Sequence, residues 1–431
     1  MFKKIALTLS LIAASLPLAA ESTHLLDIYR LALERDPQLA IAAEGLQAKL
    51  ELRPQARSAL LPTVGLGASL GRQFLCGSNS SSPCNSNYAL SLSLKQGIYH
   101  RDAFILADES EVTIRQAESE YAAAAQAVIL RVTSAYFDLL AAQDSLTLAE
   151  AEKRAISQQL NQTKQRHQVG LSAITDVHEA QAGYDLISAQ VIAAKSGVDV
   201  AREALYEIID QSPGSVALLG AEIPLESPDP EDIEAWVEAG LKENLSLQAM
   251  RLKSEVMTLT RERVAAGHYP SVDLVANLSR SDSDMSAESD NGSVGLQLEL
   301  PLYTGGYTSS KVREAGYLLA QIQSQLEQQQ RATVRAIRSA YLAVTTGISQ
   351  VLAQKQAVAS AKVAMEATQA GFEVGTRTTV DLLNSQKDLF RGERDLAKSR
   401  YDYLLATLSL KQAAGSLRGE DLNAINQLLQ P

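Results

Sequence analysis

Two hydrophobic patterns divide this chain. In the first, apolar residues alternate with polar or small ones, as at Val64, Leu66, Ala68 and Leu70. Strands of about ten residues with one apolar and one polar face suit a membrane β-barrel, and a soluble hairpin packed on a core is the alternative. The alternation predicts four strands, at about 62–74, 87–98, 271–281 and 292–302.

In the second pattern, long runs rich in Ala, Gln, Leu and Ser contain no proline, and one of them also lacks glycine over much of its length. No proline lies within 84–212 or 302–430, and no glycine lies within 98–169. Because Pro and Gly are the strongest breakers, these runs predict unusually long helices. A helix of about 70 residues would be about 100 Å long.

The second half of the chain resembles the first. The segments "VGLSAITDVHEAQ" and "VGTRTTVDLLNSQ" begin at Val169 and Val374, which are 374 − 169 = 205 residues apart. Pro62 and Pro270 occupy similar contexts 270 − 62 = 208 residues apart. We therefore predict a tandem duplication in which each half holds two strands and one helical hairpin. The predicted repeats are 21–220 and 221–431.

The segments between these elements are polar or rich in proline. Residues 205–245 contain four of the twelve prolines and predict a compact mixed patch, with the C-terminal "GSLRGEDLNAINQLLQP" beside it. The segment 281–291, "SDSDMSAESDN", predicts a solvated loop at the tip of the second strand pair. A calcium loop is the alternative, but the EF-hand spacing is absent.

Four strands are too few to close a membrane barrel. Open strand edges in lipid leave backbone N–H and C=O groups without partners, which is prohibitively costly. If the strands enter a bilayer, several chains must share one barrel, so the pattern predicts an oligomer.

The first residues indicate export. Residues 1–20 have a basic start, an apolar stretch and a small-residue end, which predicts a signal peptide rather than a membrane anchor. No later segment approaches 18 consecutive apolar residues, so we expect no transmembrane helix. In an oxidising compartment Cys76 and Cys84 are candidates for a disulfide, with two free thiols as the alternative. Two cysteines cannot make a zinc site.

Charge and motif content argue against two function classes. The net charge of −11 argues against nucleic-acid binding, which needs a basic face. None of the five histidines is paired at HxxxH spacing, and GxSxG, P-loop and GxGxxG motifs are absent. We therefore expect no catalysis, no cofactor and no metal.

The two tip segments, with "LPLYTGGY" and "LERDPQL", resemble the TolC family of outer-membrane efflux and secretion channels. The resemblance covers essentially the whole mature chain. It implies a mainly α protein with a membrane β-barrel. In the homotrimer a shared 12-stranded barrel would stand on a hollow α-helical tunnel, with an equatorial domain from 205–245 and the C-terminus.

The resemblance also assigns roles to the tip segments, at about 169–176 and 374–381. They would be the turns at the periplasmic end of the tunnel, where glycine lets the backbone reverse. They would contact a periplasmic adaptor protein, which links the channel to an inner-membrane transporter. The residues implied in that contact are Val169, Gly170, Leu171, Ser172, Val374, Gly375 and Thr376.

In the family an acidic ring narrows the entrance, and polar links hold it closed. Asp381 matches one ring acid, whereas Asn384 stands where the family has a second. Arg377 matches an arginine whose partners correspond to Thr175 and Asp176. Phe372 replaces a tyrosine that makes another link, so the closed state is expected to depend more on Arg377.

The function that follows is passive conduction. The chain would be an exit duct in the outer membrane, with its helical part in the periplasm, and export would be driven by the partner pump. A structural coiled-coil protein of the envelope is the alternative, although it would not explain the strands. The adaptor itself would need one hairpin between β domains. The sequence does not name the cargo.

Overall fold

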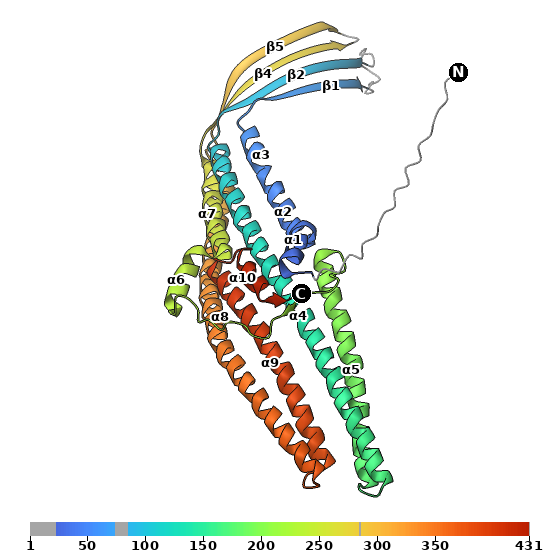
Figure 1. The fold of residues 1–431 in the computed structure, drawn as a ribbon. Helices are drawn as coiled ribbons and strands as arrows, with labels where there is room; N and C mark the ends of the chain where they lie inside the picture. Colours follow the sequence, from blue (N-terminus) through green and yellow to red (C-terminus); the bar gives the residue numbers. More distant parts are fainter. Residues whose placement is uncertain (1–22, 74–84, 284–285, 431) are drawn as a thin grey trace, which may run out of the picture.

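The computed structural model describes residues 23–73, 85–283 and 286–430. The chain is elongated, with a four-stranded sheet at one end and long helices that run away from it (Figure 1). The predicted signal peptide at 1–20 and the two cysteines, Cys76 and Cys84, lie outside the described residues.

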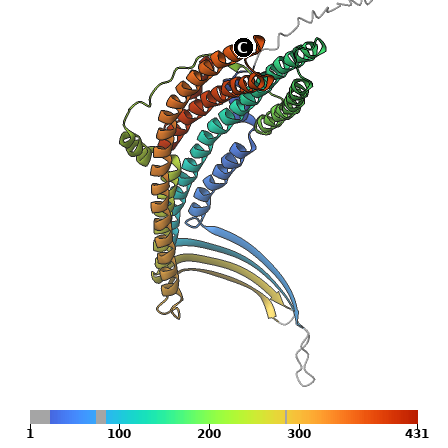
Figure 2. The same ribbon diagram turned by 90° about the horizontal axis from the view of Figure 1, so that it is seen from below.

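All neighbours in the large sheet are antiparallel, in the order β1-β2-β4-β5. The strands are β1 (Thr63–Gln73), β2 (Asn85–Tyr99), β4 (Ser271–Ser283) and β5 (Ser286–Glu299). Figure 2 shows that they curve together in the same sense. Strands β1 and β5 are the edges and have no partner on their outer side among the described residues.

The strand register gives the sheet one apolar and one polar face. One row across it joins Leu66, Leu92 and Leu278, and the adjacent row joins Ser91 with Ser279. Within 23–73, 85–283 and 286–430 nothing covers the apolar face. Its exposed side chains include Val64, Leu66, Leu70, Leu90, Leu92, Leu278, Val294, Leu296 and Leu298.

The second strand pair is longer than the alternation predicted. The β4–β5 ladder extends to the pair Ser283 and Ser286, so the expectation of a loop over 281–291 is wrong. This outer part has no apolar face, which is why the hydrophobic pattern did not reveal it. Instead Arg280 forms ion pairs across the ladder with Glu288 and Asp290.

Two antiparallel helical hairpins form the other end of the molecule. The first consists of α4 (Arg101–Gln168) and α5 (Ile174–Ile209), and the second of α8 (Tyr307–Glu373) and α9 (Thr379–Ala414). Their lengths, 68 and 36 residues against 67 and 36, match closely. Helices α4 and α9 pack against each other, so the layer order is α5-α4-α9-α8 (Figure 1).

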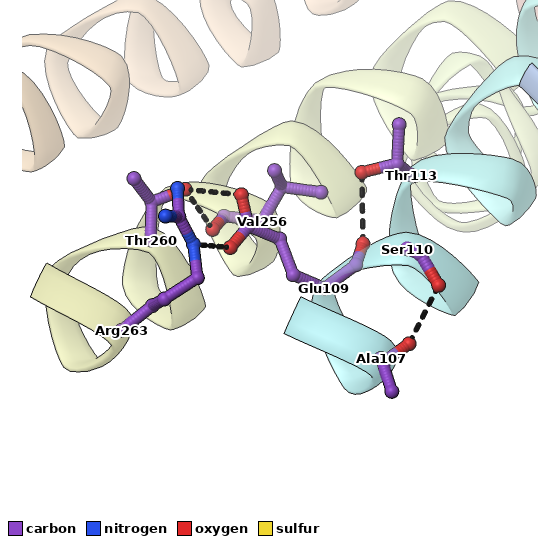
Figure 3. Close-up of polar contacts among 7 residues, drawn as sticks. All are labelled: Ala107, Glu109, Ser110, Thr113, Val256, Thr260 and Arg263. Carbon is purple, nitrogen blue, oxygen red and sulfur yellow. Dashed lines mark hydrogen bonds and ion pairs between the residues drawn. The ribbon is translucent and has the colours of Figure 1, made fainter. Parts of the chain in front are cut away.

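Shorter helices continue this layer towards the sheet. They are α1 (Leu25–Arg35), α2 (Pro37–Leu50), α3 (Leu52–Ser58) and α7 (Leu245–Ala265), followed by the 3₁₀ turn η1 (Ala266–His268). Helix α7 lies between α4 and α8. Figure 3 shows one α4–α7 contact, in which the Glu109 carboxylate accepts hydrogen bonds from Thr260 Oγ1 (2.9 Å) and Arg263 Nε (2.7 Å).

The middle of the molecule holds the main hydrophobic core. Tyr136, Phe137 and Tyr401 are buried there among residues from both hairpins. The segment after α5 and the C-terminus lie together, because β3 (Leu218–Leu219) pairs with β6 (Leu429–Gln430). Two short helices, α6 (Ile233–Glu243) and α10 (Asp421–Gln427), also belong to this middle part of the molecule.

Hydropathy alone marks one described helix as long and apolar enough to cross a membrane, namely α4. Its best 18-residue window has a mean hydropathy of 1.2, and half of that window is buried inside the protein. Core helices of soluble proteins pass the same test, so this is weak evidence for a membrane span.

Candidate functional site

The two hairpin tips reverse the chain in the same way. Gly170 (φ 78°) and Gly375 (φ 80°) adopt the left-handed conformation just after α4 and α8. In each turn a backbone N–H beyond the glycine donates to a carbonyl of the last helical turn, from Leu171 in the first tip and from Thr376 in the second, both at 2.8 Å. This is the Schellman ending of a helix. The glycine of the repeated Val-Gly is therefore explained by the left-handed backbone conformation that both turns require.

The repeated aspartate of the two tips caps the following helix. Asp176 Oδ2 accepts hydrogen bonds from Ala173 N and Ser172 Oγ, both at 3.2 Å. Asp381 Oδ2 accepts from Thr378 N (3.0 Å) and Thr378 Oγ1 (2.9 Å), which completes a capping box. The hydrogen bonds from Thr378 lower the pKa of Asp381. Its carboxylate is therefore charged at neutral pH.

The tips also expose apolar side chains at the end of the molecule. Val169 is 70% exposed, Leu171 76% and Val374 76%. Gly170, Gly375 and Thr376 lie beside them at the surface. Two of these side chains flank the turn of the first tip and one precedes the turn of the second, where they are available to another molecule.

The residues predicted to hold the closed state are not joined within one chain. Arg377 is exposed and lies against Gly371, where an added Cβ would be 2.8 Å from Arg377 Cγ. Among the described residues, no hydrogen bond or ion pair connects Arg377 to Thr175 or Asp176. Asn384 is exposed. These assignments therefore stay predictions.

Phe372 is buried, at 8% exposed, and its partner was not predicted. The Arg166 guanidinium lies over the Phe372 ring, 4.9 Å from its centroid. Farther from the turns, Leu383 of α9 packs against an apolar cluster of α4 and α5 that includes Ile156 and Tyr184. No sequence signal marked these contacts, because they join hairpins about 200 residues apart.

The chain combines a four-stranded sheet that exposes an apolar face with two duplicated helical hairpins of matched length. The family model "Outer membrane efflux protein" matches residues 28–210 and 236–416, one segment in each half. The chain belongs to this family, which includes TolC. The fold and family expected from the sequence are thus confirmed.

Individual members of the family support the same assignment. Outer membrane protein TolC of Vibrio cholerae is 37% identical, covering 99% of this chain and 98% of that protein. Alkaline protease secretion protein AprF of Pseudomonas aeruginosa is 29% identical, covering 93% and 86%. The crystal structure of the Campylobacter jejuni CmeC outer membrane channel has a TM-score of 0.81 at 16% identity, covering 99% and 97%. That likeness concerns the fold.

Family membership places the chain in the outer membrane as an efflux or secretion channel. The exposed apolar face of the β1-β2-β4-β5 sheet is then the lipid-facing surface, and the row of glycines and serines faces water. The family consists of channels and is not an enzyme family.

Proposed function

We propose that three copies of this chain form one gated exit duct that conducts cargo passively. The observation that carries the proposal is the pair of free sheet edges, β1 and β5, beside an uncovered apolar face. An open sheet of four strands leaves backbone groups unpaired in lipid, and pairing β1 of one copy with β5 of the next removes that cost. Three copies give a closed barrel of twelve strands.

The helical layer supports the same closure. Its outer helices, α5 and α8, expose apolar side chains. Leu186 and Val200 of α5 are 75% and 67% exposed, and Leu352 and Val363 of α8 are 56% and 65% exposed. When β5 of one copy meets β1 of the next, α8 and α5 of those copies become neighbours. The apolar residues would then be buried in a closed helical tunnel.

The entrance of the duct lies at the tips in this proposal. Three charged Asp381 carboxylates near one axis would favour cations, and Asn384 contributes no second charged ring. Since α8 of one copy adjoins α5 of the next, Arg377 would reach Thr175 and Asp176 of the neighbouring copy. An arginine–carboxylate link of this kind is among the stronger polar contacts. It would hold the entrance closed.

The proposed partners rest on the family and on the exposed side chains of the tips. The exposed Val169, Leu171 and Val374 would dock onto a periplasmic adaptor, which connects the duct to an inner-membrane transporter that supplies the energy. AprF is named for protease secretion, and TolC is matched along nearly its whole length. We propose that this chain likewise exports small molecules, proteins or both.

Single-channel conductance in a planar lipid bilayer tests the proposal. We expect wild-type trimers to conduct weakly and Arg377→Ser trimers to conduct several times more. Arg331→Ser is the matched control, because the Arg331 side chain is 79% exposed on α8 and forms an ion pair with Glu327 of the same helix. If well-formed trimers of all three proteins fail to conduct, the duct is refuted and a structural envelope role is favoured. If Arg377→Ser equals wild type, the proposed link is wrong.

A further inference from the structure

The seam between the two hairpins of one chain ends in a contact that the proposed gate does not include. Arg166 lies in the last turn of α4, and Phe372 and Glu373 are the last two residues of α8. The Arg166 guanidinium stacks over the Phe372 ring, with 4.9 Å to the centroid. Its Nη1 donates to the Phe372 carbonyl (3.5 Å) and its Nη2 to the Glu373 carbonyl (3.3 Å).

The chemistry of this contact suits a reversible link. The carbonyls at the end of a helix carry partial negative charge, so a cation placed beside them is stabilised. The face of an aromatic ring attracts the same cation. Phe372 is 8% exposed, so its ring is held among neighbouring side chains where it receives the guanidinium. Arg166 thus attaches the end of the second hairpin to the end of the first by three weak interactions.

Above this contact the seam is incompletely packed. A cavity of about 270 Å³ lies between α4, α8 and α9. Its lining combines glutamines, among them Gln159 and Gln386, with apolar side chains, among them Leu382 and Phe390. The Gln386 Oε1 atom is buried and has no hydrogen-bond partner among the described residues. The cavity leaves part of the seam unfilled, so the contact of Arg166 adds to what holds the ends together.

We infer that Arg166 is a positioning residue of the entrance, which keeps the two hairpin tips of the same chain together in the closed state. The inference rests on the proposed gated duct. It assigns Arg166 to the joint within a chain, whereas Arg377 belongs to the proposed joint between chains. Phe372 receives the guanidinium through its ring and needs no hydroxyl group for this role.

The test is single-channel conductance of Arg166→Ala, Arg166→Lys and Phe372→Leu trimers beside wild type. Loss of one cation–aromatic contact and one helix-end interaction is expected to raise the open fraction about threefold or more. Arg166→Lys keeps the charge and should restore part of the closure. Phe372→Leu keeps the backbone carbonyls and the bulk, so it should give a smaller increase than Arg166→Ala. The matched control is Arg154→Ala, which removes an exposed arginine from the same helix.

A second comparison separates this inference from the proposed gate. If Arg166 and Arg377 hold independent joints, the increases of Arg166→Ala and Arg377→Ser should multiply in the double variant. Wild-type conductance in Arg166→Ala, together with an increase in Arg377→Ser, would overturn the inference and leave the duct intact. Should Arg166→Ala fail to form trimers, Phe372→Leu trimers that conduct like wild type would overturn it equally. Absence of conduction in every trimer would instead refute the proposed duct.

Discussion

The joint between the end of α9 and the α6–α7 junction offers a sharp test of how the second half of the chain is assembled. Gly415 follows α9 with a φ of 83° and lies against the junction of α6 and α7. A Cβ at this position would be 2.3 Å from Glu243 O, 2.5 Å from Glu243 C and 2.8 Å from Asn244 N. All three are backbone atoms, so a rotamer change cannot relieve the overlap.

The loss of unfolding free energy in Gly415→Ala has two sources, the backbone conformation of residue 415 and the displacement of the α6–α7 junction. The left-handed conformation costs alanine about 1–2 kcal/mol. Shifting the junction also disturbs Asn244, which caps α7 through Leu247 N (2.9 Å) and donates to Ala413 O (3.0 Å). A cap and a hydrogen bond contribute about 1 kcal/mol each. We therefore expect a total loss of about 3–4 kcal/mol.

Gly375→Ala is the matched control. Gly375 has nearly the same φ, 80°, but an added Cβ would meet no atom within 4 Å. Only the conformational cost of about 1–2 kcal/mol should remain. The difference between the two variants isolates the overlap with the α6–α7 backbone.

The assay is the heat-denaturation midpoint of detergent-solubilised trimers, followed by circular dichroism at one heating rate. For a chain of this length 1 kcal/mol corresponds to about 1 °C. Gly415→Ala should thus lower the midpoint by about 3–4 °C and Gly375→Ala by about 1–2 °C. Equal losses in the two variants, or a larger loss in Gly375→Ala, would refute the role assigned to the joint.

Two further predictions concern charged groups. Burial raises the pKa of Asp144, and the hydrogen bond from Tyr401 (2.6 Å) opposes that rise. Because the pKa in the folded protein is raised, the stability linked to this carboxyl is present at low pH. It is lost as the pH rises through the elevated pKa. Tyr401→Phe should therefore lower the free energy of unfolding more at neutral than at acidic pH, by about 1.5–3 kcal/mol at neutral pH. Tyr403→Phe loses hydrogen bonds to backbone groups and should show no such pH dependence. The denaturation midpoint measured at both pH values checks this. Asp381→Asn should reduce the preference of the channel for cations, measured as the reversal potential in a KCl gradient. The control is Asp388→Asn, which changes an exposed carboxylate of the same helix and should leave the reversal potential unchanged. Equal shifts in the two variants would place the selective charge elsewhere.

Much of the architecture was determined locally and could be predicted from the sequence. The absence of Pro and Gly predicted the long α4, and the absence of Pro predicted α8, which forms although it contains Gly316, Gly347 and Gly371. The period-2 alternation predicted the sheet wherever one face is apolar. It did not reveal the part of β5 from Ser286 to Asn291, where both faces are polar and alternation carries no signal. The tip glycines were predicted as turns, and the sequence Thr378 to Asp381 also contained the spacing of a capping box.

Contacts between distant segments were decided only by the tertiary structure. The sequence marked Arg377 and Phe372 through a resemblance, but not Arg166, whose partner lies 206 positions away. Gly415 resembled any helix-ending glycine until the fold brought Glu243 against it. Helix and strand propensities act over a few residues, whereas packing depends on which surfaces the whole chain brings together. For the same physical reason, the strand order that leaves β1 and β5 at the edges of the sheet was decided by the fold and not by the pattern of any one strand.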